Sequence, residues 1–210
     1  MAVVLAFHVS PIERPSVQQE AAMSSHAYTN YLEVLLADAI ELNAAHTRLR
    51  TGQPGRQWGL GAVNRPVVVL CVSAWEAYLE ELIKEAIETM RPSGPALGIW
   101  PALKAQTLSD AGRFNNPNVE NAMKLFATIL GLTDVTLAWS WRNSNRDSAR
   151  GYLNEALSHR HQIAHGVSPR PTIHNDYARW LPAFFRNLGN CTDNAVRDHL
   201  VNSLGILAPW

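Results

Sequence analysis

Apolar residues recur three and four positions apart along most of the chain, the spacing of one face of an α-helix. The first such stretch runs from Ser16 to about Arg50. Its apolar positions are Tyr28, Tyr31, Leu32, Leu35, Leu36, Ala39, Ile40 and Leu42. The segment from Thr51 to Gly55 holds two glycines and a proline, which predicts the end of this helix.

A second apolar stripe continues for five turns and predicts the central helix of a bundle. Asn64 and Pro66 open it, since Asn caps helices and Pro is tolerated in a first turn. The stripe consists of Val68, Val72, Trp75, Leu79, Leu82 and Ala86. The other face carries one lysine, Lys84, and five glutamates: Glu76, Glu80, Glu81, Glu85 and Glu88. We interpret this face as a solvated, acidic helix surface.

Shorter helical patterns fill the rest of the chain. One is expected around residues 101–108, and one from Val119 to Leu130 between an Asn118 cap and a stop at Gly131. Residues 132–141 read as an irregular or short helical connection. Three further helices are expected at 145–163, from 175 or 176 to 188, and from 192 or 193 to 204, followed by an apolar tail at 206–210 that docks on the core or on a partner. We therefore predict an all-α fold and a single domain over residues 1–210.

Composition narrows the class of protein without naming a function. Of 210 residues, 47% are hydrophobic and 17% charged, which is typical of a globular domain. The net charge is zero, so any nucleic-acid binding must come from a local patch. Cys71 and Cys191 read as buried thiols rather than a disulfide. The apolar start, Met1 to Phe7, lacks a basic region, and no apolar run approaches membrane-spanning length, so we expect a cytoplasmic protein without a membrane partner.

Charge is unevenly distributed despite the zero balance. Residues 142–170 contain five arginines against two acidic residues, Asp147 and Glu155. The predicted helix at 145–163 is therefore basic, in contrast to the acidic second helix. Trp139, Trp141 and Tyr152 lie close to it in sequence, and they belong either to the core or to a surface that stacks on unpaired bases.

A dense histidine cluster stands at the end of this basic helix. His159, Arg160, His161 and His165 fall within seven residues. The periodicity places Arg160 on the packed face, where a charge needs a partner or an opening. Arg160 and His165 are five residues apart, which turns them about 140° from each other on an ideal helix. They can meet at one phosphate only if the helix ends near Ala164 or if a second subunit contributes, whereas His161 and His165 share a face.

Three chemistries and one structural interpretation compete for the cluster. A serine or cysteine nucleophile lacks an activating motif. A metal site at His159, His161, His165 and His174 lacks the Glu of a His-Glu-x-x-His helix and a nearby Cys or Asp, so no metal or cofactor is expected. Metal-free RNA cleavage needs a base, an acid and a cation, which His165 and Arg160 supply. Alternatively, the cations favour the C-terminal helix dipole before a stop at Gly166.

The same residues carry a resemblance to a known family. Arg160, four residues and His165 resemble the Arg-x(4–6)-His motif of the HEPN superfamily, with His161 at a place where Asn or Asp is more usual. The ending from Ile163 to Gly166 is similar to that of the RiboL-PSP-type HEPN domain. So are the segments from Ser73 to Leu82 and from Phe114 to Asn118. Together these motifs cover roughly residues 65 to 190.

The resemblance implies a fold, an activity and a set of roles. The fold would be an all-α, HEPN-like helical bundle with additional peripheral helices, assembled as a homodimer. The activity would be that of a metal-independent endoribonuclease acting on RNA, in toxin–antitoxin systems or antiphage defence, with an antitoxin protein as a candidate partner. Arg160 would bind the scissile phosphate, His165 would act as general base or acid, and His161 would orient or assist. The alternative is a non-catalytic HEPN-type helical module that binds a partner protein or a nucleotide.

Overall fold

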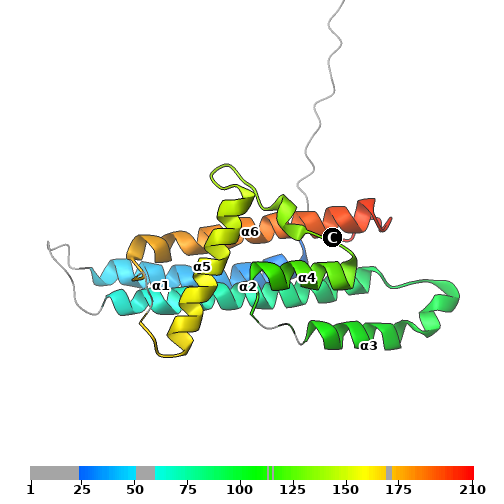
Figure 1. Cartoon of the computed structure of the whole chain (residues 1–210), viewed down its shortest axis with the longest axis horizontal. Helices are drawn as coiled ribbons and strands as arrows, with labels where there is room; N and C mark the ends of the chain where they lie inside the picture. Colours follow the sequence, from blue (N-terminus) through cyan, green and yellow to red (C-terminus); the bar gives the residue numbers. More distant parts are fainter. Residues whose placement is uncertain (1–23, 51–59, 113, 115, 169–171) are drawn as a thin grey trace, which may run out of the picture.

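The computed structural model describes residues 24–50, 60–112, 114, 116–168 and 172–210. Within these ranges the regular structure is helical, apart from one isolated bridge between Trp141 and Ser144. The elements are η1 Tyr28–Leu32, α1 Glu33–Leu49, α2 Gly61–Thr89, η2 Gly94–Gly98, α3 Trp100–Ala111, α4 Val119–Leu130, η3 Val135–Ala138, α5 Arg146–Ala164 and α6 Asn175–Asn202 (Figure 1). The all-α prediction is confirmed. The predictions for Met1–Phe7 and Thr51–Gly55 fall outside the described residues.

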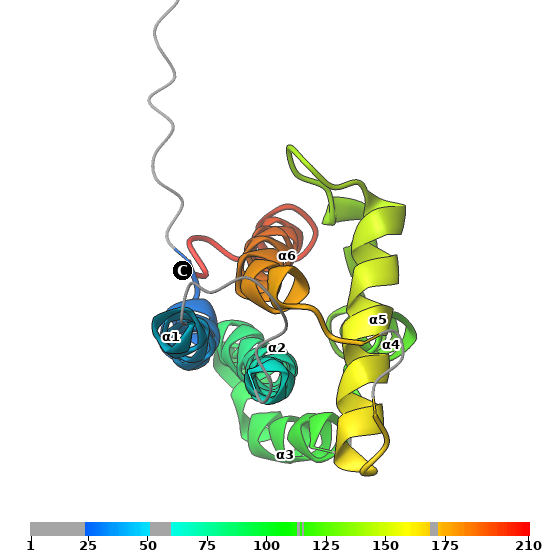
Figure 2. The same ribbon diagram turned by 90° about the vertical axis from the view of Figure 1, so that its left-hand side faces the viewer.

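Helix α2 forms the centre of the bundle. It contacts α1, α3, α4, α5 and α6, and α1 and α6 run along it while α5 crosses them steeply (Figures 1 and 2). The predicted stripe of α2 is fully buried, which confirms its central place. Trp75 anchors the core, where its ring packs against Tyr78 and Trp139 and its Nε1 donates to the Pro117 carbonyl at 3.1 Å.

The predicted start of α2 at Asn64 is wrong. The helix begins at Gly61, and Asn64 lies buried inside it with its Nδ2 donating to the Ile173 carbonyl at 3.1 Å. Asn64 therefore fastens the segment before α6 to α2, a long-range role that local capping preference does not reveal. Pro66 falls in the second turn rather than the first.

The first helix is shorter than predicted within the described residues. Ser24 and Ser25 are not helical, and helical backbone begins at His26. The N–H groups of His26 and Ala27 donate to the two carboxylate oxygens of Glu85, at 2.9 Å each. A carboxylate from α2 thus occupies the amide end of this helix, where negative charge is favoured.

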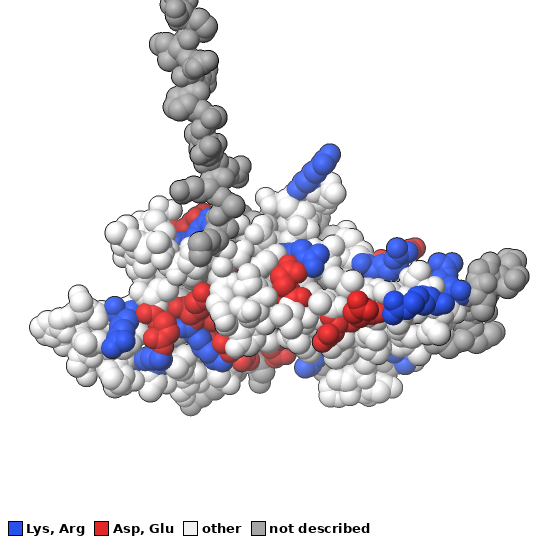
Figure 3. Space-filling view, turned by 180° about the vertical axis from the view of Figure 1, so that it is seen from behind, with Lys and Arg blue, Asp and Glu red and all other residues white. Residues whose placement is uncertain are grey.

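Glu85 is one of several glutamates of α2 that have specific partners, so the predicted solvated face is only partly solvated. Glu81 pairs with Lys84 at 2.6 Å, and Glu88 pairs with Lys104 of α3. Acidic and basic side chains lie interspersed on the face seen in Figure 3. On this face the acidic side chains therefore do not form a broad acidic patch.

The two helices predicted after residue 175 are one helix, α6, of 28 residues. The predicted break between residues 188 and 192 contains Gly189, which is helical and buried. A Cβ at this position would lie 2.2 Å from the Leu32 Cδ2 and 3.3 Å from the Tyr28 Cε2. Gly189 thus allows η1 and α6 to approach each other, and the helix continues through it.

The C-terminal tail docks on the core, which is one of the two predicted alternatives; the other was docking on a partner. The Trp210 Nε1 donates to Asp193 at 3.1 Å, and Asp193 also accepts from the Ser25 N–H at 3.0 Å and from the Ser25 hydroxyl. The Tyr78 hydroxyl lies 3.5 Å from the same carboxylate. Burial raises the pKa of Asp193. This cluster ties both ends of the described chain to α2 and α6.

The elements that lead into α5 follow their predictions. Asn118 caps α4 through its Oδ1, which accepts from the Asn121 N–H at 2.8 Å, and Gly131 ends the helix with φ 74°. Residues 132–141 form the expected connection with one short 3₁₀ turn, η3. No helix within the described ranges is both long and apolar enough to cross a membrane.

Candidate functional site at the end of α5

Helix α5 presents the motif residues at its C-terminal end. It begins after Asn145, whose Oδ1 accepts from the Ser148 N–H at 2.9 Å, and it packs Ala149, Leu153, Ala156 and Leu157 into the core. It ends at Ala164, where Gly166 takes φ 69° and the Val167 N–H donates to the Gln162 carbonyl at 2.8 Å. The predicted bounds, 145–163, are thus nearly those observed.

Arg160 is half-exposed and faces α2. Its Nη2 lies 4.0 Å from the Glu76 Oε2, and its side chain is 41% exposed. This carboxylate is the partner that a charge on the packed face requires. At 4.0 Å the two groups attract each other without a hydrogen bond, so the guanidinium fork keeps its donors for another oxyanion such as a phosphate.

His161 and His165 form an exposed pair. Their ring centroids are 4.3 Å apart with an interplanar angle of 55°. The prediction that they share a face is therefore confirmed. His165 is the first residue past the helix, and its φ of −90° and ψ of 12° lie outside the helical region. The helix thus ends at Ala164, one of the two conditions under which Arg160 and His165 could meet at one phosphate. On an ideal helix the two positions are turned about 140° from each other.

His159 lies apart from this pair. It is buried, neither ring nitrogen has a hydrogen-bond partner among the described residues, and its ring meets the Tyr177 ring edge-on at 5.3 Å. Burial lowers the pKa of His159, which favours the neutral imidazole. His174 is exposed at the start of α6. The four histidines of the metal alternative are therefore not gathered, and the described part of the chain contains no group of three metal-ligating side chains.

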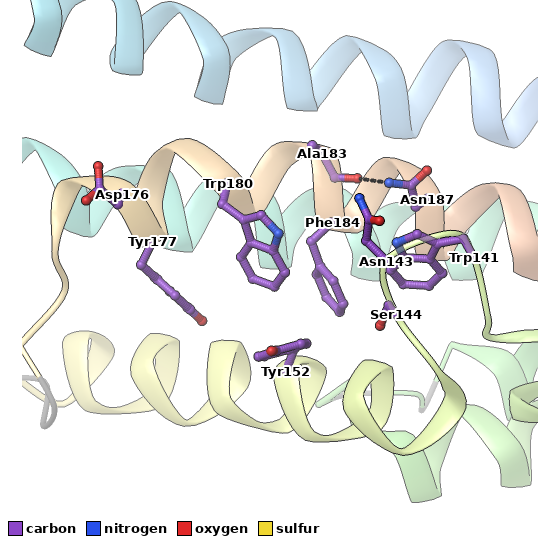
Figure 4. Close-up of a pocket in the computed structure, with 10 residues that line it drawn as sticks. All are labelled: Trp141, Asn143, Ser144, Tyr152, Asp176, Tyr177, Trp180, Ala183, Phe184 and Asn187. Carbon is purple, nitrogen blue, oxygen red and sulfur yellow. Dashed lines mark hydrogen bonds between the residues drawn. The ribbon is translucent and has the colours of Figure 1, made fainter.

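The aromatic residues near the motif divide between the core and a cavity. Trp139 is fully buried, and its Nε1 donates to the Thr192 hydroxyl at 2.9 Å. Trp141 and Tyr152 instead line an open cavity of about 450 Å³ between α5 and α6 (Figure 4). The other lining residues are Asn143, Ser144, Asp176, Tyr177, Trp180, Ala183, Phe184 and Asn187.

Two features of this region were not identified from the sequence. The sequence pattern places Glu76 on a solvated face, although it lies within the segment from Ser73 to Leu82 that carries the resemblance. Trp180 and Phe184 had been assigned to the apolar side of a helix, which does not distinguish a core face from a cavity wall. In both cases the surroundings of the residue depend on how α5 crosses α2 and α6, and a local sequence pattern does not predict that crossing.

Comparisons with known proteins place these motifs in a family. The search of curated proteins and the search of solved structures each give no match. A family model described as RiboL-PSP-HEPN matches residues 40–198. The matched range includes the segment from Ser73 to Leu82, the Asn118 cap and the whole stretch from Arg160 to His165. The chain thus belongs to the RiboL-PSP-HEPN family, as the resemblance of its motifs had indicated.

Proposed function

We propose that this protein is a metal-independent endoribonuclease that cleaves RNA at a composite Arg/His site formed across a homodimer. The observation that supports the proposal is the exposure of the polar side chains at the end of α5. Arg160 is half-exposed with one distant ion-pair partner, and His161 and His165 are exposed and adjacent. A structural helix end would not need two imidazoles in contact, and an exposed imidazole such as that of His165 is suited to the proton transfer that cleavage requires.

The proposed reaction uses the 2′-hydroxyl of the RNA as its nucleophile. An imidazole removes the proton of this hydroxyl, and the 2′-oxygen attacks the adjacent phosphorus. The bond from phosphorus to the 5′-oxygen breaks, and an acid protonates the leaving oxygen. The products are a 2′,3′-cyclic phosphate and a 5′-hydroxyl. Arg160 would bind the phosphate and stabilise the charge that builds on it, His165 would transfer the proton, and His161 would orient or assist His165.

The need for a second copy follows from two arguments. One imidazole does not readily serve as base and acid in the same step. In addition, Arg160 faces α2, and ideal helical spacing turns a position five residues later about 140° away from it. A two-fold axis beside the end of α5 would place the guanidinium of one chain opposite the imidazole of the other.

Glu76 is the observation that favours the alternative, a non-catalytic module that binds a partner protein or a nucleotide. Its carboxylate lies near Arg160 and repels a phosphate at the same place. The pair is long and partly exposed, so it opposes phosphate binding only weakly. For this reason we favour the nuclease, with a cellular role as a toxin or defence effector held in check by an antitoxin.

A subunit-mixing experiment tests the composite site directly. RNA is incubated in EDTA with the parent, Arg160→Ala, His165→Ala and a coexpressed mixture of the two variants. We expect cyclic phosphate ends with the parent, loss of cleavage with each variant, and partial recovery with the mixture, because one site of each mixed dimer is intact. His174→Ala, an exposed histidine outside the cluster, is the matched control. Full activity of His165→Ala would refute the nuclease, and two inactive variants whose mixture does not recover cleavage would refute the shared site.

A further inference from the structure

The cavity between α5 and α6 has walls made of aromatic rings. Trp180 and Phe184 of α6 stand 4.9 Å apart between centroids, and Tyr152 of α5 meets Trp180 edge-on at 4.9 Å. Trp141, from the loop before α5, closes one end with its ring 5.9 Å from Phe184 (Figure 4). Tyr152 and Trp180 remain 40% and 38% exposed, so the rings are open to a ligand.

Polar groups lie at the edges of this aromatic cavity. Asn143 lies beside Trp141, and Asn187 donates through its Nδ2 to the Ala183 carbonyl at 2.9 Å, which leaves its Oδ1 as an acceptor (Figure 4). The Tyr177 hydroxyl is buried and has no hydrogen-bond partner within the described part of the chain. A buried hydroxyl without a partner is uncommon, and here it belongs to a cavity-lining residue.

The lining selects for a neutral, planar and polar-edged ligand. It contains one carboxylate, Asp176, and no lysine or arginine, so it disfavours a phosphate group. Aromatic faces bind flat rings, and asparagine amides pair with the hydrogen-bonding edges of bases, adenine above all. The volume of about 450 Å³ is within the ordinary range for a small-molecule site.

We propose that this cavity is a base-binding subsite that holds one unpaired nucleobase of the RNA. This proposal rests on the proposed function. The cavity and the motif share a helix: Tyr152 precedes Arg160 by eight residues, about 12 Å along the axis of α5. Tyr177 spans this interval, because it lines the cavity and also contacts His159 beside Arg160. A single strand along this seam would place a base among the rings and a nearby phosphate at Arg160.

The substrate class that follows is single-stranded RNA. A paired base is stacked in its duplex and does not present a free face to Trp180, whereas an unpaired base does. Sequence preference would come from Asn143 and Asn187 at the edge of the base. Cleavage is therefore expected in loops and unpaired segments, with a preferred base at a fixed distance from the cut.

The test separates base binding from catalysis. His165→Ala protein, which cannot cleave if the proposed function holds, is titrated with a short fluorescent single-stranded RNA and with the same RNA in duplex form. Trp180→Leu and Asn143→Ala are then added to this background, with Asn190→Ala, an exposed asparagine of α6 outside the cavity, as the matched control. Circular dichroism verifies that each protein remains helical.

We expect the single strand to bind and the duplex to bind far more weakly. Trp180→Leu should weaken binding of the single strand about tenfold to a hundredfold, the range that stacking of one base gives, and Asn143→Ala should weaken it less. Asn190→Ala should bind as the His165→Ala parent does. Asn143 is in a loop, so its variant keeps the test valid if Trp180→Leu does not fold.

Several results would overturn the subsite. One is unchanged affinity in both cavity variants, and another is equal affinity for the duplex. A third is a dimer that Trp180→Leu converts to a monomer, because the cavity would then belong to the subunit interface. The proposed function fails separately: if the parent binds the single strand through Trp180 and Asn143 but does not cleave it, the subsite stands and the nuclease does not.

Discussion

The buried cluster around Asp193 and the exposed cluster at the end of α5 use polar side chains in opposite ways. Asp193 accepts bonds from Ser25 and Trp210 inside the core. Arg160 has one partner 4.0 Å away, and His161 and His165 contact each other at the surface. The first cluster joins both ends of the described chain to the bundle. The second leaves its donors and acceptors open to solvent, where a ligand can reach them.

This contrast leads us to expect that stability and the proposed activity are separable in this molecule. Changes around Asp193 and Gly189 should alter the free energy of unfolding. Changes at the end of α5 should alter activity on RNA with little effect on unfolding. Four substitutions test this contrast, in order of decreasing expected effect.

The largest effect is expected for His165→Ala. Loss of a positioned acid or base lowers cleavage about 10²- to 10⁴-fold. The free energy of unfolding should change by less than about 1 kcal/mol, because His165 is exposed and interacts with the rest of the chain mainly as a cap residue. Cleavage rates and urea unfolding measure the two quantities. If the free energy of unfolding falls by as much as the activation free energy of cleavage rises, stability and activity are not separable at this position.

Gly189→Ala should destabilise the fold by about 1–3 kcal/mol, because its new Cβ would meet the buried Leu32 at 2.2 Å. The matched control is Gly151→Ala in α5, where a Cβ meets nothing within 4 Å. Alanine favours the helix there, so Gly151→Ala should stabilise by about 0.5–1 kcal/mol. Urea unfolding of the two variants checks this, and shifts of the same sign would contradict the close approach of α6 to η1.

Asp193→Asn should destabilise by about 1–3 kcal/mol in acid, since the amide turns two N–H groups toward the donors of Ser25 and Trp210 where the protonated carboxyl has one O–H. Burial raises the pKa of Asp193 above its ordinary 3.8, so the folded protein holds this proton to higher pH than the unfolded chain does. The stability that this group contributes is therefore lost as pH rises from 3.8 through the folded pKa. The difference in free energy of unfolding between the parent and Asp193→Asn should therefore shrink as pH rises across that window, and urea unfolding at several pH values measures it. A difference that grows with pH would contradict the raised pKa.

The smallest effect on stability is expected for Glu76→Gln, less than about 0.5 kcal/mol, because its pair with Arg160 is long and partly exposed. Affinity for RNA should rise modestly, since a negative charge beside the proposed phosphate site is removed. Filter binding in a His165→Ala background measures it, with Glu80→Gln, a neighbouring glutamate of α2, as the control. A drop in affinity would mean that Glu76 positions Arg160 rather than competing with its ligand.

The helical class, the central place of α2 and the bounds of α4 and α5 could be predicted because they depend on local signals. The stripe from Val68 to Ala86, the Asn118 cap and the Gly131 stop are such signals. Asn64 and Gly189 were misjudged because their local preferences, for a cap and for a break, were overridden by contacts with Ile173 and Leu32. Residues far apart in sequence decided both positions.

The candidate site divides in the same way. The sequence by itself determined the motif, and helical spacing determined the shared face of His161 and His165. Only the tertiary structure brought Glu76 to Arg160, buried His159 and opened an aromatic cavity between α5 and α6. The reason is physical: spacing along one helix fixes directions around its own axis, whereas the neighbour that each direction meets depends on how separate helices cross.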